Sequence, residues 1–190
     1  TSQGAIDAGS YTIVPGGLSS SNYAISYLSG PLTINAAPLS AISLSGSRPY
    51  DGTKDVAANI FTLSGLVSGQ DLKLSGVGTI ADKNVGDNKP VTLGTLQLGD
   101  GTKGLAKNYT FTGGTQTVSI TPANLAVSTK DVTKIYDGTL KAVGVPVVSS
   151  GTLFSGDSLS AGVFAFTDKN VGSGNKTVTV DAVTVGDGVN

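Results

Sequence analysis

Two short motifs carry side chains that could bind a ligand. The first is Tyr50-Asp51-Gly52, followed by Thr53, and it returns as Tyr136-Asp137-Gly138, followed by Thr139. A tyrosine ring could stack on a sugar while the neighbouring carboxylate accepts hydrogen bonds from its hydroxyl groups. Alternatively the Asp-Gly pair makes a tight turn, because Gly accepts positive φ and Asp bonds its own backbone. We favour the turn, and expect both tyrosine rings to be buried at the edge of their own module's core.

The second motif is Asp-Lys-Asn-Val-Gly, and three interpretations of it stay open. Its first member contains Asp82, Asn84 and Gly86, and its second contains Asp168, Asn170 and Gly172. The aspartate and asparagine oxygens could bind calcium, the one cofactor considered, although the adjacent lysine opposes a cation. Lys83 or Lys169 could form an isopeptide bond to an Asn, chemistry that commonly uses a buried Glu, which this chain lacks. The simplest interpretation is a turn with an ion pair between exposed side chains, worth about 0–1 kcal/mol.

Two asparagines lie in the glycosylation sequence Asn-X-Thr. These are Asn108, in Asn108-Tyr109-Thr110, and Asn175, in Asn175-Lys176-Thr177. The pattern is short and common by chance, and Asn108 belongs to a repeated Asn-Tyr element in which a turn is an alternative role. Both are retained as glycosylation candidates.

The composition excludes several classes of function. The 190 residues contain no Cys, His, Met or Trp, all 13 acidic residues are Asp, and Arg48 is the only arginine. Catalytic triads, cysteine nucleophiles, zinc sites and haem ligation therefore have no residues to use. A net charge of -1 argues against nucleic-acid binding, and no apolar run approaches the roughly 18 residues of a membrane helix. We expect neither an enzyme nor a membrane-inserted protein.

Both motifs repeat with one period, which defines the organisation of the chain. The Tyr-Asp-Gly and Asp-Lys-Asn-Val-Gly motifs each return after 86 residues, and Asn108-Tyr109 lies 86 residues after Asn22-Tyr23. We expect residues 1–36 to be the end of one repeat, 37–122 a complete repeat and 123–190 a partial one. Short joins containing one proline each predict stacked modules with limited bending.

Within each repeat, apolar residues alternate with polar ones. Examples are Tyr109-Thr110-Phe111, Val118-Ser119-Ile120 and Val178-Thr179-Val180. Alternation of this kind, with frequent Asp-Gly turns, predicts short half-buried β-strands. The expected fold class is all-β, with tandem immunoglobulin-like β-sandwich repeats of about 86 residues. A β-solenoid ranks second, because it would need a shorter period.

The motifs resemble known modules of bacterial surface proteins. Tyr-Asp-Gly-Thr followed some 30 residues later by Asp-Lys-Asn-Val-Gly resembles the YDG repeat. The first segment, with Asn22-Tyr23 leading to Leu32-Thr33-Ile34, looks like the end of an MBG repeat. This resemblance implies a filamentous-haemagglutinin-like adhesin, secreted to the bacterial surface, in which such repeats form a stalk or filament.

These observations favour a structural segment of an extracellular adhesin over a ligand-binding module. Its expected partners are other copies of itself or neighbouring repeats, and any host or matrix receptor is not specified by the sequence. The alternative is a glycan- or receptor-binding module that uses Tyr23, Tyr27 and Tyr109 as a stacking platform.

The partial repeat lacks the equivalent of residues 104–122, which carry two expected strands. The opening segment contains that missing pair. We therefore expect the opening segment of one chain to complete the closing module of the next, by strand addition or as the continuation of a longer polymer. Such head-to-tail association does not close on itself and produces fibres.

Overall fold

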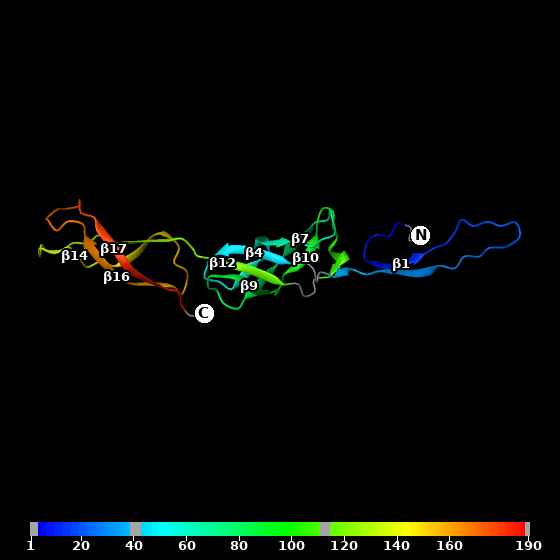
Figure 1. Ribbon diagram of the computed structural model, residues 1–190, viewed down its shortest axis with the longest axis horizontal. Helices are drawn as coiled ribbons and strands as arrows, with labels where there is room; N and C mark the ends of the chain where they lie inside the picture. Colours follow the sequence, from blue (N-terminus) through cyan, green and yellow to red (C-terminus); the bar gives the residue numbers. More distant parts are fainter. Residues whose placement is uncertain (1–3, 39–42, 111–114, 189–190) are drawn as a thin grey trace. The chain divides into compact units, whose positions relative to one another are not determined.

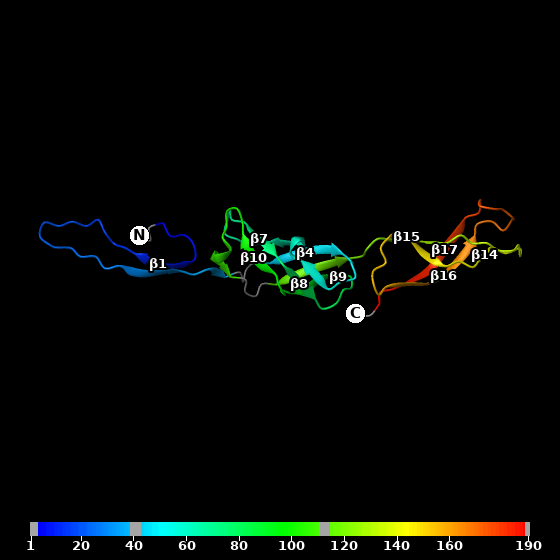
Figure 2. The same cartoon turned by 180° about the vertical axis from the view of Figure 1, so that it is seen from behind.

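The computed structural model describes residues 4–38, 43–110 and 115–188 (Figures 1 and 2). Over these residues the protein is all-β, as the sequence predicts. Its helices are single 3₁₀ turns, so none is a candidate for spanning a membrane in the described chain. The chain divides into two compact units, the first comprising residues 1–47, 55–81 and 88–119 and the second residues 48–54, 82–87 and 120–190.

The opening segment of the first unit is a two-stranded hairpin. Strand β1 (Gly9–Ile13) pairs antiparallel with β2 (Gly30–Ile34), with Gly9 opposite Ile34. Leu32 and Ile34 are half-buried in it, and Ile25 in the connecting loop is 39% exposed. No further strand pairs with this hairpin among the residues that are described.

A curled six-stranded sheet follows and is compatible with the expected β-sandwich. Its order is β5-β8-β9-β12-β4-β6. The strands are β4 (Leu44–Pro49), β5 (Asp55–Ala57), β6 (Phe61–Leu63), β8 (Val77–Ile80), β9 (Gly86–Thr92) and β12 (Gln116–Thr121). The alternation predicted for β12 is confirmed, because Val118 and Ile120 are each 1% exposed while Ser119 is only half-buried. Leu44 and Val56, in other strands of the sheet, are fully buried.

Smaller pairings complete this part of the chain. Strand β7 (Leu72–Ser75) pairs antiparallel with β10 (Gln97–Asp100), and β3 (Ala37–Pro38) pairs parallel with β11 (Tyr109–Thr110). The 3₁₀ turns are η2 (Ala58–Ile60) and η3 (Ala106–Asn108). The ring of Tyr109 is buried against Ala37, Leu66, Leu72 and Leu98. Phe111, expected to continue β11, lies outside the described residues.

The second unit has two smaller sheets and little buried apolar surface. Strand β13 (Leu125–Thr129) pairs with β15 (Pro146–Gly151), and β16 (Ser158–Phe166) lies between β14 (Lys141–Ala142) and β17 (Val178–Gly186). All of these pairings are antiparallel. Within the described part of residues 123–190, only Ala142 and Phe164 are buried hydrophobic residues.

The two YDG-like repeats differ at the neighbours of β12. In the complete repeat, β12 lies between β9 and β4. The positions 86 residues after β4 and β9 are 130–135 and 172–178, and before Val178 neither segment is a strand. The described part of the third repeat has no equivalent of β12.

Candidate interaction site at the repeated motifs

The two Tyr-Asp-Gly motifs form the same turn. In each, the aspartate Oδ1 accepts hydrogen bonds from the backbone N–H and the hydroxyl group of the threonine two residues later. The glycine between them has positive φ, +76° at Gly52 and +73° at Gly138. This conformation favours glycine, and the aspartate bonds replace backbone hydrogen bonds. The structural interpretation of Asp51 and Asp137 as turn residues therefore agrees with the geometry.

A basic residue before each turn belongs to the same repeated unit, although it lies outside the Tyr-Asp-Gly motif. Arg48 Nη1 lies 2.5 Å from Asp51 Oδ1, and Arg48 Nη2 donates to the carbonyl oxygen of Thr53 at 2.8 Å. Lys134 lies 86 residues later; its Nζ is 2.7 Å from Asp137 Oδ1 and donates to the carbonyl oxygen of Thr139 at 2.8 Å. The Lys134 hydrogen bond and the Thr139 backbone N–H lower the pKa of Asp137 to about 2. A search of the sequence for basic residues of either type, Arg or Lys, spaced 86 positions apart would have found this pair.

The ring of Tyr50 contacts residues that follow it by more than 100 positions. It packs edge-to-face on Phe154, with ring centroids 5.6 Å apart and an interplanar angle of 81°. Its hydroxyl group lies 3.1 Å from Asp157 Oδ1 and 3.0 Å from Asp157 Oδ2. A Cβ atom added at Gly52 would lie 2.8 Å from Phe154 Cβ, so the Phe154 side chain occupies the space beside the turn. Tyr50 is half-buried rather than largely buried, and its partners belong to the third repeat rather than to its own module.

Lys83 joins the same group of residues. Its Nζ lies 3.2 Å from Asp157 Oδ1 and 5.7 Å from the centroid of the Tyr50 ring. The side chains of Lys83 and Asp157 are only 8% and 4% exposed. Hydrogen bonding with Tyr50 and then with Asp157 raises the pKa of Lys83 above its ordinary value, against the opposing effect of burial. The expectation of an ion pair between exposed side chains was therefore wrong for Lys83.

We call Tyr50, Gly52, Lys83, Phe154 and Asp157 the Tyr50–Asp157 cluster. All five residues belong to the second compact unit. Neither Phe154 nor Asp157 was a candidate from the sequence. Asp157 lies 86 residues after Asp71 and could have been found by that spacing, whereas Ser68 occupies the position equivalent to Phe154. The cluster combines an aromatic contact with a buried ion pair, and it uses both repeated motifs.

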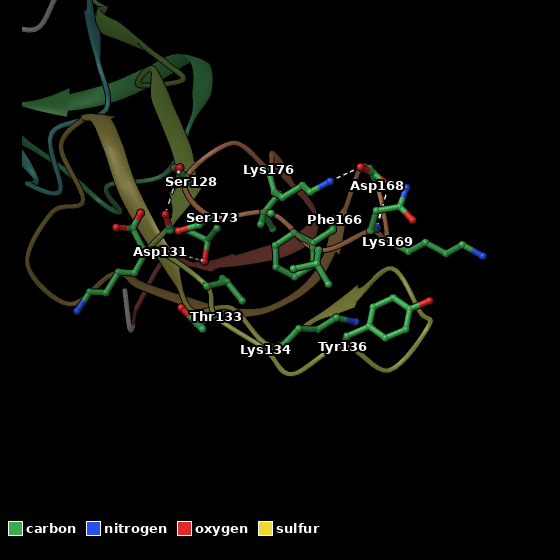
Figure 3. Close-up of a pocket in the computed structure, with 18 residues that line it drawn as sticks. Ser128, Asp131, Thr133, Lys134, Tyr136, Phe166, Asp168, Lys169, Ser173 and Lys176 are labelled. Carbon is green, nitrogen blue, oxygen red and sulfur yellow. Dashed lines mark hydrogen bonds and ion pairs between the residues drawn. The ribbon is translucent and has the colours of Figure 1, made fainter.

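The second copies of the two motifs have a different environment. Tyr136 is 58% exposed and Lys169 is also exposed, so the expected burial of the Tyr136 ring was wrong. Over the described residues, no hydrogen bond or ion pair reaches the Tyr136 hydroxyl group or the Lys169 ammonium group. Figure 3 shows both side chains extending outward on the side of the view opposite Asp131. Tyr50 and Lys83 therefore have side-chain partners, whereas the equivalent Tyr136 hydroxyl group and Lys169 ammonium group have none among the described residues.

The Asp-Lys-Asn-Val-Gly motifs also form matching turns. Asp82 Oδ1 accepts from the backbone N–H of Asn84 at 3.0 Å, and Asp168 Oδ1 accepts from that of Asn170 at 2.9 Å. Asp168 also forms an ion pair with Lys176, and these contacts lower its pKa, the Asn170 N–H most strongly. Gly86 begins β9, whereas Gly172 lies in irregular backbone. The turn interpretation agrees with this geometry.

Neither chemical alternative for this motif gains support from its surroundings. Within the described ranges, no three acidic side chains group as ligands for a metal ion, and calcium stays a prediction without a defined site. Lys83 Nζ donates to the carboxylate of Asp157. Its raised pKa favours the ammonium form, which is not a nucleophile.

A groove of about 690 Å³ lies in the third repeat (Figure 3). One wall comes from residues 128–134 and Tyr136, and the other from residues 168–174 with Lys176 and Val178. These walls include the segments equivalent to β4 and β9, which flank β12 in the complete repeat. The groove therefore lies where an equivalent of β12 would pair.

The glycosylation candidates and the tyrosines of the expected stacking platform differ in their solvent exposure. Asn108 Oδ1 accepts from the backbone N–H of Ala8 at 2.6 Å, and its Nδ2 donates to Asp7 at 2.9 Å, whereas Asn175 is exposed. Glycosylation at either residue stays a prediction. The expected tyrosine platform was wrong in one member: Tyr109 is 7% exposed and its hydroxyl group donates to Gln70, so its ring cannot stack on a ligand. Tyr23 is 77% exposed and Tyr27 is 38% exposed.

Comparison with known families identifies the repeats. The YDG domain family matches residues 33–118 and again 121–190, and the MBG domain (YGX type) matches residues 1–33. The chain therefore belongs to the YDG domain family and begins with MBG-type sequence. Modules of both kinds are often found in surface proteins. No curated protein and no solved structure matches the chain.

Proposed function

We propose that the chain is a structural segment of a secreted bacterial adhesin, forming part of its stalk or filament. It acts mechanically and not as an enzyme, and it lies at the bacterial surface or in an extracellular filament. The modules are joined in series, and the partners of each are the neighbouring repeats or other copies of the chain.

The observation that carries this proposal is the Tyr50–Asp157 cluster. A recognition site at Tyr50 and Lys83 would leave these two side chains open to a ligand. Tyr50 and Lys83 instead contact Phe154 and Asp157 of the following repeat, with the lysine and aspartate side chains almost fully buried. Breaking one partner of a buried ion pair is costly, because it leaves the other charge uncompensated. A junction of this kind suits a segment that transmits force or keeps modules aligned.

The test compares a junction variant with its repeated counterpart. Phe154→Ala and Lys83→Met remove contacts of the Tyr50–Asp157 cluster, whereas Lys169→Met changes the equivalent exposed lysine. We expect the first two variants to broaden the distance distribution between spin labels at Lys54 and Ser160, which both lie in the second unit, and Lys169→Met to leave it unchanged. Equal distributions in all four proteins would reject a junction that keeps the modules aligned. Tight binding of wild-type protein in a glycan screen, lost in Tyr23→Ala, would favour the recognition alternative.

The groove in the third repeat supports the assembly part of the proposal. Its walls include the equivalents of the two strands that flank β12. Strand β2 lies 86 residues before residues 116–120 of β12, and places Leu32 and Ile34 at the positions of Val118 and Ile120. The last two are buried in the complete repeat, whereas Leu32 and Ile34 are half-buried. Strand addition of β2 from one chain into the groove of another would bury these residues and satisfy the open ladder positions.

Sedimentation velocity tests this assembly. We expect the wild-type chain to form larger species as its concentration rises, and Ile34→Asp to abolish them. Leu28→Asp is the matched control, because Leu28 is 88% exposed in the loop before β2. A single monomeric species at every concentration would reject assembly by strand addition while leaving the junction within one chain unaffected.

A further inference from the structure

The surface formed by Tyr136, Gly138 and Lys169 is chemically equivalent to one half of the Tyr50–Asp157 cluster. Each residue lies 86 positions after Tyr50, Gly52 or Lys83. The turns that carry them have the same hydrogen bonds in both repeats. In the first copy this surface is covered by Phe154 and Asp157, and in the second its tyrosine and lysine are exposed.

We propose that the Tyr136–Lys169 surface (Tyr136, Gly138 and Lys169) binds the Phe-Ser-Gly-Asp turn of another YDG module. This inference rests on the proposed junction function. Lys169 supplies the positive charge and Tyr136 the hydroxyl donor for the aspartate of the incoming turn, while the Tyr136 ring receives its phenylalanine. The occupant is thus a module with the same turn as residues 154–157.

The turn presents both contact groups from one rigid element. The backbone N–H of Asp157 donates to the carbonyl oxygen of Phe154 at 3.0 Å, and Gly156 has a φ of +91°. The ring and the carboxylate therefore lie at the two ends of one turn. Gly138 leaves space for the ring, because a Cβ atom added there would meet nothing within 4 Å, whereas one at Gly52 would lie 2.8 Å from Phe154 Cβ.

Exposed apolar side chains beside this surface add to the case for an occupant. Ile135 is 91% exposed and Val171 is 84% exposed. Val85, which lies 86 residues before Val171, is 53% exposed and lines a pocket together with Tyr50, Phe154 and Asp157. A module seated on the second copy of the surface would cover Val171 in the same way and remove apolar area from water.

The corresponding turn of the complete repeat does not fit this surface. Ser68 stands at the position of Phe154, so the aromatic contact is missing. The carboxylate of Asp71 accepts hydrogen bonds from the backbone N–H groups of Thr102 and Lys103 and from the Thr102 hydroxyl group. These bonds lower the pKa of Asp71, the Thr102 N–H most strongly, and hold its oxygens within its own repeat. Phenylalanine therefore distinguishes a turn that docks from one that does not.

Two extended chains test the proposal with the whole protein retained. The control adds a copy of residues 104–122 after Asn190, which continues the repeat and supplies the strand for the groove. The test chain adds a copy of residues 104–190, which supplies the same strand and then a second Phe-Ser-Gly-Asp turn. The added turn follows Tyr136 in the repeat pattern as residues 154–157 follow Tyr50. Nitration of tyrosine and acetylation of lysine, located by peptide mass spectrometry, report the exposure of Tyr136 and Lys169.

We expect Tyr136 and Lys169 to react freely in the control and to become as protected as Tyr50 and Lys83 in the test chain. Phe154→Ser in the added copy alone should restore their reactivity. Equal reactivity in the control and test chains overturns the proposal, and so does an added copy whose β16 shows no protection from hydrogen exchange. The reactivity of Tyr50 in the 190-residue chain separates failure of the proposed junction from failure of docking on the Tyr136–Lys169 surface. If Tyr50 reacts there as freely as Tyr136, the junction itself fails.

Discussion

Tyr50 and Asp157 lie 107 positions apart in the sequence, and the Tyr50 hydroxyl group contacts both carboxylate oxygens of Asp157, at 3.1 and 3.0 Å. Tyr136, the repeated counterpart of Tyr50, is 58% exposed. The two tyrosines are therefore a matched pair in one chain, since the same motif carries both and, among the described residues, only the Tyr50 hydroxyl group has a partner.

Removing the hydroxyl group should have unequal effects at these two positions. Tyr50→Phe keeps the ring against Phe154 but deprives Asp157 of a donor, and should lower the free energy of unfolding by about 1–2 kcal/mol. Tyr136→Phe should change it by less than about 0.5 kcal/mol, as exposed substitutions usually do. Urea unfolding followed by circular dichroism measures both. Equal effects of the two substitutions would contradict the pairing of Tyr50 with Asp157.

The two glycines of the turns allow a second comparison. Gly52→Ala and Gly138→Ala both place a side chain at positive φ, which costs about 1 kcal/mol. Only at residue 52 would the new Cβ also meet Phe154 Cβ, at 2.8 Å. We therefore expect Gly52→Ala to be more destabilising in thermal unfolding, by about 1–3 kcal/mol beyond Gly138→Ala. The excess should disappear when Phe154 is also changed to Gly, which removes the Cβ atom, and an excess that persists would assign it to another cause.

Burial also differs between equivalent strands. Ile120 in β12 is 1% exposed, whereas Ile34, which lies 86 residues earlier in β2, is half-buried. Ile120→Ala should cost about 2–5 kcal/mol, the usual range for a fully buried isoleucine, and Ile34→Ala about 1 kcal/mol or less. Chemical denaturation at protein concentrations too low for association measures both values. A large loss from Ile34→Ala under these conditions would show that β2 has a core of its own.

Sequence reasoning succeeded where structure depends on neighbouring residues. Alternation in Val118-Ser119-Ile120 predicted a half-buried strand, and Asp51-Gly52 predicted a turn, because both follow from local backbone geometry. It failed for Tyr136 and Lys83, whose surroundings come from distant segments. The same motif is half-buried at Tyr50 and exposed at Tyr136, and a period detected in the sequence does not reveal that difference.

Titration of Asp137 provides a test of the turn at low pH. Its pKa is lowered to about 2 by the Lys134 hydrogen bond first and by the Thr139 backbone N–H next. The folded-state pKa lies below the unfolded value, so the contribution of this carboxylate to stability is complete above about pH 4. It is lost as the pH falls from about 4 towards 2, because protonation then occurs first in the unfolded chain.

Carboxyl ¹³C NMR should therefore give Asp137 a midpoint near 2, and Lys134→Met should raise it towards the ordinary value of 3.8. Asp137→Asn should flatten the dependence of unfolding free energy on pH in that interval, because the titrating group is gone. Lys141→Met is the control, since Lys134 contacts only the backbone carbonyl oxygen of Lys141 and needs no part of that side chain. A native midpoint near 3.8, or one that Lys134→Met leaves unchanged, would contradict the assigned cause. Because Asp137 Oδ1 is also the acceptor for Thr139, protonation should weaken the turn itself, and the Thr139 amide should exchange faster with solvent as the carboxylate titrates.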